Sequence, residues 1–422
     1  MTSGGSGPAG CDRYMQRKLD ELRLIEAALA KPPSPPRTRR LSTLLKRKFR
    51  SAAMCRSQMA AEHWSQTETN WKSGPCGSGA FRFDYDYQRA DLHVEGPPVY
   101  PVRGLPPVLP AQFTTSGMAA ISAVLLALRE LWPRCSFDVR ADGYPETGEL
   151  IALLANVAGS GAMLQRVIVL DSTVDTPKSA AARLDGGDIA LFDTSCFSAS
   201  SGRIARIAEA ARERQVPLIL ARSHTKLDCF GLDYGRLGSL VVLAGNGSEA
   251  TIHKLAGDFI RLTGSAALPL HFPPFAAGES FHSLTRARIA WMIRSTRVIE
   301  KGLRDGAIRS RHFAHGLYVS VFPRCYPDRE AASDAAADLI ARFVAAGIPA
   351  RHAGSFGFDF FGCDWFEDPA DGTIGLRLST GDLPISLVER AAATLVSWCR
   401  QESRRTAAGG GADSERASQR KR

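Results

Sequence analysis

The stretch Ile189–Leu243, IALFDTSCFSASSGRIARIAEAARERQVPLILARSHTKLDCFGLDYGRLGSLVVL, decides the fold. Short apolar runs, typical of buried parallel strands, occupy 189–192, 216–221 and 239–243. Between the first two runs, apolar residues recur at helical spacing, so we expect a helix that returns the chain to the same sheet. Asp193 and Lys226 would then lie at the carboxyl edge of that sheet, where open α/β sheets bind ligands.

An acid and a lysine that follow neighbouring strands indicate pyridoxal phosphate chemistry. In such enzymes a lysine amine forms a Schiff base with the cofactor aldehyde, and a carboxylate keeps the pyridine nitrogen protonated. Ser223, Thr225 and Arg236 add hydroxyls and a guanidinium suited to a phosphate. A lone lysine after a strand is usually a solvated surface group, so the hypothesis depends on the complete set. It requires no metal ion.

This stretch resembles the active-site half of the fold-type I pyridoxal phosphate enzymes. FDTSCFSASSG is similar to the segment of aspartate aminotransferases that carries the ring-nitrogen aspartate, and RSHTKLDCFGLDYGRLGSL is similar to their lysine segment. SHTK also fits the S-x-T-K signature of the cystathionine synthase and lyase (trans-sulfuration) family. The resemblance implies that Lys226 is the Schiff-base lysine and that Asp193 pairs with the ring nitrogen. It also implies that Ser223, Thr225 and Arg236 bind the cofactor phosphate.

Cys196 departs from the aminotransferase pattern. It stands where those enzymes place a tyrosine that hydrogen-bonds the phenolic oxygen of the cofactor.

A Ser-Gly step precedes a strongly apolar segment in FTTSGMAAISAVLLALREL. The start of the predicted helix offers free backbone N–H groups and a positive end to a phosphate, although a plain Ser/Thr helix cap gives the same pattern. SGMAAI resembles the S-G-M-A-A motif of the trans-sulfuration family. The resemblance implies that Ser116, Gly117 and Met118 hold the cofactor phosphate.

Three further positions are assigned from the same resemblance. Tyr144, in CSFDVRADGYPETGEL, falls where the family stacks an aromatic ring on the pyridine. RVIVLDSTVDTP resembles the family's E-S-P-T-N-P segment, which places Asp175 at the asparagine that contacts the phenolic oxygen. GLRLSTGD resembles the R-L-S-x-G stretch, so Arg377 is predicted to bind the α-carboxylate of a substrate.

Composition excludes several classes. The chain has 422 residues, is 44% hydrophobic, and carries a net charge of +10 with a pI near 9.3. Its nine cysteines form no CxxC pair and no secretory leader opens the sequence, so reduced thiols in the cytoplasm are expected. No apolar run approaches the length of a membrane span, and no membrane contact is expected.

Residues 1–50 are predicted to be a basic N-terminal arm, with a helix from Cys11 to Ala30. The run RTRRLSTLLKRKFR (37–50) holds seven basic side chains. It suits either a nucleic acid or phosphorylated ligand, or a solvated or partner-docked helix, and the second reading is favoured because no nucleic-acid motif accompanies the run. Residues 51–112 are expected to be irregular, and either an active-site lid or edge strands explain them equally well.

The predicted fold class is α/β, a mostly parallel sheet between helices, with a small α+β C-terminal domain. The large cofactor-binding domain is expected at 113–275, a linking helix at 276–300 and the small domain at 301–400. The small domain would contain strands at LYVSVF, GSFGFDFF and TIGLRLSTG, and residues 401–422 would be disordered.

The expected activity is that of a pyridoxal phosphate-dependent transferase or lyase acting on an α-amino acid. SGMAAI, SHTK and RLSTG favour β- or γ-elimination or replacement, with S-adenosylmethionine as one conceivable γ-leaving-group donor and an anionic acceptor such as a nucleotide. An aminotransferase is the alternative. A third hypothesis, a regulator that keeps the fold without chemistry, is supported only by the basic run. The resemblance also implies a homodimer or larger assembly.

Overall fold

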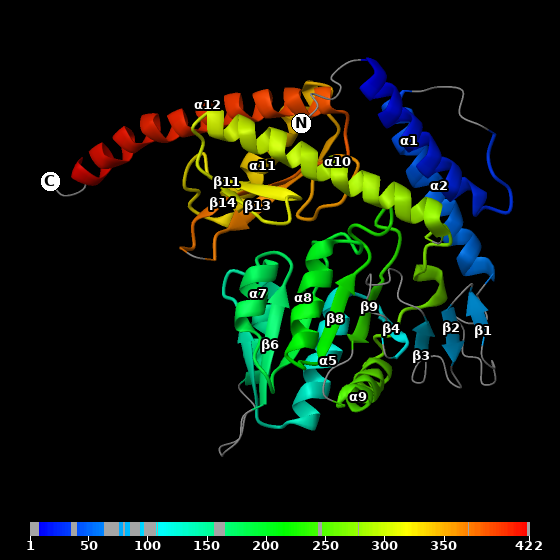
Figure 1. The fold of residues 1–422 in the computed structure, drawn as a ribbon. Coiled ribbons are helices and arrows are strands. Elements are labelled where there is room, and N and C mark those ends of the chain that lie inside the picture. The colour runs from blue at the N-terminus through cyan, green and yellow to red at the C-terminus, as the bar shows by residue number, and fades with distance from the viewer. Residues whose placement is uncertain are drawn as a thin grey trace. The chain divides into compact units, whose positions relative to one another are not determined.

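The computed structural model describes residues 8–34, 40–62, 76–78, 81–84, 93–96, 107, 109–155, 165–243, 247–276, 278–369 and 371–419. They form two compact units, one from Lys18 to Arg286 and one that combines Met1–Arg17 with Ala287–Arg422. Each unit has its own sheet, and Figure 1 traces the elements of both.

The larger unit is built on a mixed sheet with the strand order β1-β2-β3-β4-β9-β8-β7-β6-β5. The strands are β1 Cys76–Ser78, β2 Phe81–Asp84, β3 His93–Gly96, β4 Ala111–Thr114, β5 Cys135–Val139, β6 Gln165–Asp171, β7 Ile189–Asp193, β8 Leu218–Ser223 and β9 Gly238–Leu243. Neighbours from β5 to β8 pair in parallel, whereas β9 is antiparallel to both β8 and β4. Within 111–243, therefore, β9 runs against the other five strands.

The three strands expected from the sequence coincide with β7, β8 and β9. Their apolar residues are buried, as continuous apolar runs predict. One difference concerns β9. Its apolar run predicted a parallel strand, but β9 pairs antiparallel with β8. The link between β8 and β9 contains no helix, and without a helical crossover the chain returns beside β8 in the opposite direction.

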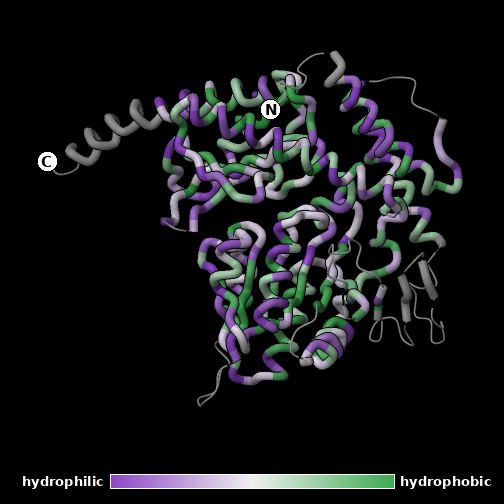
Figure 2. Tube along the Cα trace, viewed as in Figure 1, coloured by the Kyte–Doolittle hydropathy of each residue, from purple (hydrophilic) through white to green (hydrophobic). Residues whose placement is uncertain are grey.

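Helices cover both faces of this sheet. They are α5 Gly117–Leu131, α6 Pro145–Ala155, α7 Pro177–Arg183, α8 Gly202–Glu213 and α9 Glu249–Leu262. The connections β6-α7-β7 and β7-α8-β8 step along the sheet in one direction, whereas β4-α5-β5 steps the other way, so right-handed crossovers put α5 on the opposite face from α7 and α8. In agreement, α5 packs against α9, and α7 against α8. Figure 2 shows hydrophobic and hydrophilic residues alternating along these helices, as one buried face requires.

The basic run lies on α2 (Leu41–Glu62), beside α1 (Pro8–Ala27). The Lys48 ammonium is buried and donates to Glu21 of α1 at 2.5 Å and to the carbonyl of Phe230 at 2.6 Å, and Arg47 pairs with Glu26. Part of the run therefore faces the protein's own interior. The expectation of irregular structure from residue 51 is wrong up to Glu62, where α2 ends. It is also wrong at β1, β2 and β3, which lie at one edge of the sheet as the edge-strand alternative predicted. Most of the rest of 63–108 lies outside the described residues, and the lid hypothesis stays a prediction.

The smaller unit contains a five-stranded sheet with the order β10-β11-β14-β13-β12. Its elements are β10 Ser310–His312, β11 Tyr318–Val321, α11 Arg329–Ala345, β12 Ala350–His352, β13 Phe361–Glu367, β14 Ile374–Ser379 and α12 Ile385–Gln419. The predicted linking helix is α10, Gly278–Asp305. The strand predicted at GSFGFDFF is wrong, because β13 begins only at Phe361 and Gly357 adopts a left-handed φ of 99° that interrupts a strand. Helix α12 continues through most of the tail that was expected to be disordered.

The α/β fold class with a second α+β unit is thus confirmed. Among the described residues, none of the helices combines the length and hydrophobicity needed to cross a bilayer.

Candidate active site

Lys226 and Asp193 lie at the same edge of the larger sheet. Asp193 is the last residue of β7 and is paired in register with Ala221 of β8, and Lys226 lies in the turn that follows β8. Because β7 and β8 are parallel neighbours, their carboxyl ends meet at one edge. The structure therefore brings the two segments together as expected, while the chemical roles of the two side chains stay predictions.

The turn that carries the lysine, residues 222–229, is here named the lysine turn. The Asp228 carboxylate accepts hydrogen bonds from Arg222 Nε and Nη2 at 2.6 and 2.8 Å. His224 Nδ1 lies 2.8 Å from the same carboxylate, and its Nε2 lies 2.7 Å from Ser239 Oγ in β9. All four side chains are buried, so the turn is held by a sealed polar network.

This network also reaches the segment after β7. Arg222 Nη1 donates to the carbonyls of Thr194 and Phe197 at 2.7 and 2.8 Å. Both carbonyls belong to the four residues that follow Asp193. One guanidinium therefore connects the segment after β7 to the lysine turn. The chain of contacts from Ser239 through His224 to Asp228 resembles the catalytic triad of a hydrolase. All three side chains are buried, however, so a substrate cannot reach the serine hydroxyl.

Electrostatics fix the charges in the network. Burial alone would raise the pKa of Asp228, but the charge and hydrogen bonds of Arg222 lower it to about 2. Burial lowers the pKa of His224, which keeps the imidazole neutral near pH 7. Our sequence interpretation missed this network. The one signal in the sequence was the spacing of His224 and Asp228 within SHTKLD, because Ser239 in β9 is distant in the chain.

A polar cradle forms where α5 begins. Ser116 caps the helix, and its Oγ accepts a hydrogen bond from Ala119 N at 3.0 Å. Ser223 Oγ and Thr225 Oγ1 lie 2.9 Å apart in the lysine turn, and Ser223 is in close contact with Gly117. The predicted residues Ser116, Gly117, Ser223 and Thr225 thus converge on one place.

Two glycines allow this convergence. A Cβ on Gly117 would lie 3.0 Å from the backbone nitrogen of Ser223, and a Cβ on Gly238 would lie 2.2 Å from the carbonyl carbon of Ser116. Larger side chains would therefore push the helix start away from β8 and β9. Backbone amides at a helix N-terminus together with two hydroxyls are the donor set that a phosphate monoester needs, so the residues fit the phosphate of pyridoxal phosphate.

Tyr144 lies on a second turn at the same edge, residues 140–145, here named the tyrosine turn. The Lys226 ammonium is 5.2 Å from the centroid of the Tyr144 ring. The backbone N–H of Tyr144 donates to Asp171 Oδ2 at 2.6 Å. An aromatic face beside the lysine amine fits the flat ring of the cofactor.

Asp171 is a site residue that the sequence interpretation missed. It ends β6 and is paired in register with Asp193, the end of β7. Burial and the charge of Asp193 raise the pKa of Asp171 to about 6. A small cavity lies against Tyr144, Asp171 and Asp193. Its position as the last residue of an apolar strand, like that of Asp193, was the signal available in the sequence.

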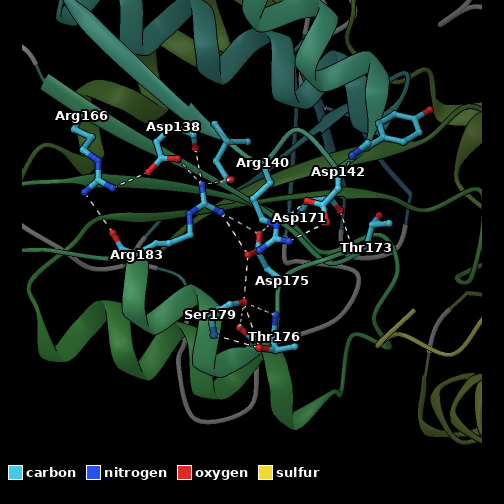
Figure 3. Close-up of polar contacts among 12 residues, drawn as sticks. Asp138, Arg140, Asp142, Arg166, Asp171, Thr173, Asp175, Thr176, Ser179 and Arg183 are labelled. Atoms are coloured by element: carbon cyan, nitrogen blue, oxygen red, sulfur yellow. Dashed lines mark hydrogen bonds and ion pairs between the residues drawn. The ribbon is translucent and has the colours of Figure 1, made fainter. Parts of the chain in front are cut away.

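Asp175 is fully buried and belongs to a ladder of ion pairs. Its Oδ2 accepts from the backbone N–H of Asp171 at 2.9 Å and lies 3.3 Å from Arg183 Nη1. Arg183 also pairs with Asp138, and Asp138 pairs with Arg166, as Figure 3 shows. The predicted contact of Asp175 with the phenolic oxygen remains a prediction, and in this structure its carboxylate holds the end of β6.

Cys196, Met118 and Arg236 are the other residues that the resemblance assigned to the cofactor, and the charges of Lys226, Asp171 and Asp193 act on the Cys196 thiol. Burial raises the pKa of the Cys196 thiol to about 12, and its sulfur lies 3.6 Å from Thr173 Oγ1. Met118 Sδ accepts a weak hydrogen bond from Thr147 Oγ1. Arg236 is exposed, and its charge lowers the pKa of His271, after the larger effect of burial. Their cofactor contacts remain predictions.

Arg377 lies in the smaller unit, on β14. Its guanidinium is 5.4 Å from the centroid of the Tyr318 ring of β11 and donates to the carbonyl of Gly354. The side chain is partly buried, with its fork held by these contacts. Its predicted role as carboxylate ligand is untested.

Comparison with solved structures identifies the fold. A cystathionine gamma synthase from Xanthomonas oryzae pv. oryzae, in complex with cystathionine, superposes with a TM-score of 0.52 at 17% identity, over 83% of this chain and 99% of that chain. This chain has the fold of the fold-type I pyridoxal phosphate enzymes. Less similar are a methionine gamma lyase from Micromonospora echinospora (TM-score 0.42, 18% identity, 67% of this chain and 80% of that chain) and a Thermus thermophilus aspartate aminotransferase (0.40, 13%, 68% and 79%).

No protein-family model matches the sequence, and no curated protein matches it. At these identities the likeness defines the fold, and the activity has to be argued from the site.

Proposed function

We propose that this protein is a pyridoxal phosphate-dependent enzyme acting on an α-amino acid. The observation that carries the proposal is the meeting of Lys226 and Asp193 at one sheet edge, beside the cradle at the start of α5. When bound, pyridoxal phosphate supplies an aldehyde that reacts with amines and a ring that accepts electrons.

Each side chain at this edge has a distinct task. Lys226 Nζ would hold the cofactor through its aldehyde, and the same amine would move a proton from and to the Cα of the substrate. The Asp193 carboxylate would pair with the ring nitrogen of the cofactor, and the Tyr144 ring would offer an aromatic surface to its pyridine ring. Ser116, Gly117, Met118, Ser223, Thr225 and Arg236 would hold the phosphate.

The remaining predicted residues tune the site. The Cys196 thiol is assigned to the phenolic oxygen of the cofactor. The Asp175 carboxylate was predicted for the same oxygen, and its bonds to Arg183 and to the N–H of Asp171 would have to change for that contact. Arg377 binds the substrate α-carboxylate bidentately and so orients the Cα bond that breaks.

The reaction we favour is β- or γ-elimination or replacement. The SGMAAI, SHTK and RLSTG segments support this class, and the compared gamma synthase was solved with cystathionine. A narrower version uses S-adenosylmethionine as the donor of a γ-leaving group and an anionic acceptor such as a nucleotide, in line with the basic charge of the chain. The aminotransferase alternative is supported by the FDTSC segment.

A substrate panel tests the proposal. Purified protein is loaded with pyridoxal phosphate and incubated with single amino acids, and with S-adenosylmethionine plus nucleotides, while the absorbance spectrum and the products are followed. Loss of a side-chain group supports elimination or replacement, whereas pyridoxamine phosphate and a keto acid indicate transamination. A protein that binds no pyridoxal phosphate but binds DNA contradicts the proposal and supports a regulator.

We also propose that the chain acts as a homodimer, because the resemblance implies active sites at a subunit boundary. Light scattering of the loaded protein tests this, and a monomer that is fully active contradicts it.

A further inference from the structure

Asp171 occupies an unusual electrostatic position for a buried carboxylate. The residue is 8% exposed, and its register partner across the sheet is another acid, Asp193. Its carboxylate is bonded to the amides of Tyr144 and Thr173, at 2.6 and 2.7 Å, and to the Thr173 hydroxyl rather than to a cation. Burying an acid beside a second acid costs free energy. Stability of the fold therefore does not explain an acid at this position.

The two neighbouring arginines make their ion pairs with other carboxylates. Arg183 is paired with Asp175 and Asp138, and Arg140 with Asp142 at 2.9 Å, as Figure 3 shows. Asp175 in turn fixes the backbone of Asp171 through its N–H at 2.9 Å. The ladder thus holds the main chain of Asp171 in place and leaves the carboxylate directed at the tyrosine turn.

The contact with the tyrosine turn is tight. A Cβ added at Gly143 would lie 3.1 Å from Asp171 Oδ2, so the turn rests directly on the carboxylate. The next residue along is Tyr144, whose ring centroid is 5.2 Å from Lys226 Nζ. A shift of the turn would therefore change where the aromatic ring lies relative to the lysine amine.

We propose that Asp171 is a positioning residue that places the Tyr144 ring for binding of the pyridoxal ring. The inference rests on the proposed function. It assigns to Asp171 no contact with the reacting atoms. Its effect is transmitted through the backbone N–H of Tyr144, and the hydrogen bond is charge-assisted when the carboxylate is ionised.

A double-mutant cycle with a binding readout tests this. The dissociation constant of pyridoxal phosphate is measured by fluorescence titration of the cofactor-free protein at pH 8, for the unsubstituted protein, Asp171→Asn, Tyr144→Leu and the double variant. We expect Asp171→Asn to weaken binding about tenfold when Tyr144 is present, the size of one charge-assisted hydrogen bond, and less than about twofold in the Tyr144→Leu background.

Asp188→Asn is the matched control. Asp188 is also a buried acid that accepts a backbone N–H, but it precedes β7 at the far end of the strand. It should leave binding within about twofold of the starting value.

Each result has one meaning. Equal weakening by Asp171→Asn in both backgrounds, or none in either, overturns the positioning role. If the unsubstituted protein itself fails to bind pyridoxal phosphate, the proposed function fails, which is a different outcome from a normal starting affinity with no effect of the variant.

A second pair of variants keeps the test valid if Asp171→Asn does not fold. Gly143→Ala displaces the turn from the same carboxylate and should weaken binding several-fold, about threefold to tenfold, with a changed circular dichroism of the bound cofactor. Gly148→Ala is its control, since a Cβ there meets no atom within 4 Å. Equal binding and dichroism for the two alanine variants contradict the proposal.

Discussion

The lysine turn and the tyrosine turn lie at the same edge of one sheet and are held in opposite ways. The lysine turn is fixed by buried side chains, with Arg222 and Asp228 at 6% and 2% exposure. The tyrosine turn is partly buried, and its own ion pair, Arg140 with Asp142, is 38% and 30% exposed. Its firm attachment is the backbone hydrogen bond to Asp171.

This contrast suggests a division of labour. A covalent anchor needs a fixed amine, and a sealed ion network supplies a turn that cannot shift without losing several partners. An aromatic ring that packs on a cofactor must adjust as groups enter and leave, and a partly exposed turn is better suited to small adjustments than a sealed one. Unfolding energies measured for variants of the two turns test this difference.

The largest effect is expected in the lysine turn. Asp228→Asn leaves the Arg222 guanidinium buried without its counter-charge, and we expect the free energy of unfolding to fall by about 3–5 kcal/mol. Urea unfolding followed by circular dichroism measures it.

Asp142→Asn is the counterpart in the tyrosine turn. Because this pair is substantially exposed, its removal should cost less than about 1 kcal/mol. Similar losses for the two variants would contradict the proposed difference between the turns.

The second effect concerns pH and Asp171. Because the pKa of Asp171 in the folded protein is raised from 3.8 to about 6, its contribution to stability is present at low pH and is lost as the pH rises through about 6. Relative to Asp171→Asn, the cofactor-free protein should therefore lose about 2 kcal/mol of stability between pH 4.5 and 7. Urea unfolding of both proteins across this range measures the difference. A difference that stays constant, or that grows in favour of the unsubstituted protein as the pH rises, contradicts the assigned environment.

An effect smaller than that of Asp228→Asn is expected at Ser239, the β9 end of the network that holds the lysine turn. Ser239→Ala removes the hydroxyl that lies 2.7 Å from His224 Nε2 and leaves that nitrogen buried without a partner. We expect the free energy of unfolding to fall by about 1–3 kcal/mol. The loss should be smaller than for Asp228→Asn, because this variant leaves no buried charge without its counter-charge. A loss as large as that of Asp228→Asn would show that the imidazole, and not the ion pair, holds the turn.

The sequence predicted the elements that depend on local pattern. The apolar runs located β7, β8 and β9, and the strand ends brought Asp193 and Lys226 to one edge. The antiparallel course of β9 was not predictable from hydrophobicity, because a buried antiparallel strand can show the same apolar run as a parallel one.

The site was predicted less completely than the fold. In VLDSTVD two acids lie four residues apart, and the pattern does not say which side chain faces the site. The structure shows Asp171 turned to the tyrosine turn and Asp175 turned to Arg183. Likewise, the buried partners of His224 come from β9 and from the turn, and such tertiary contacts leave no periodic signal in the sequence.

The most direct test of the central claim is the absorbance spectrum of the purified protein loaded with pyridoxal phosphate, compared with that of Lys226→Ala. The account predicts a band from a Schiff base between the cofactor and the protein that survives gel filtration, and its loss, together with turnover, in the variant. A variant that keeps both the band and the activity would contradict the assignment of Lys226.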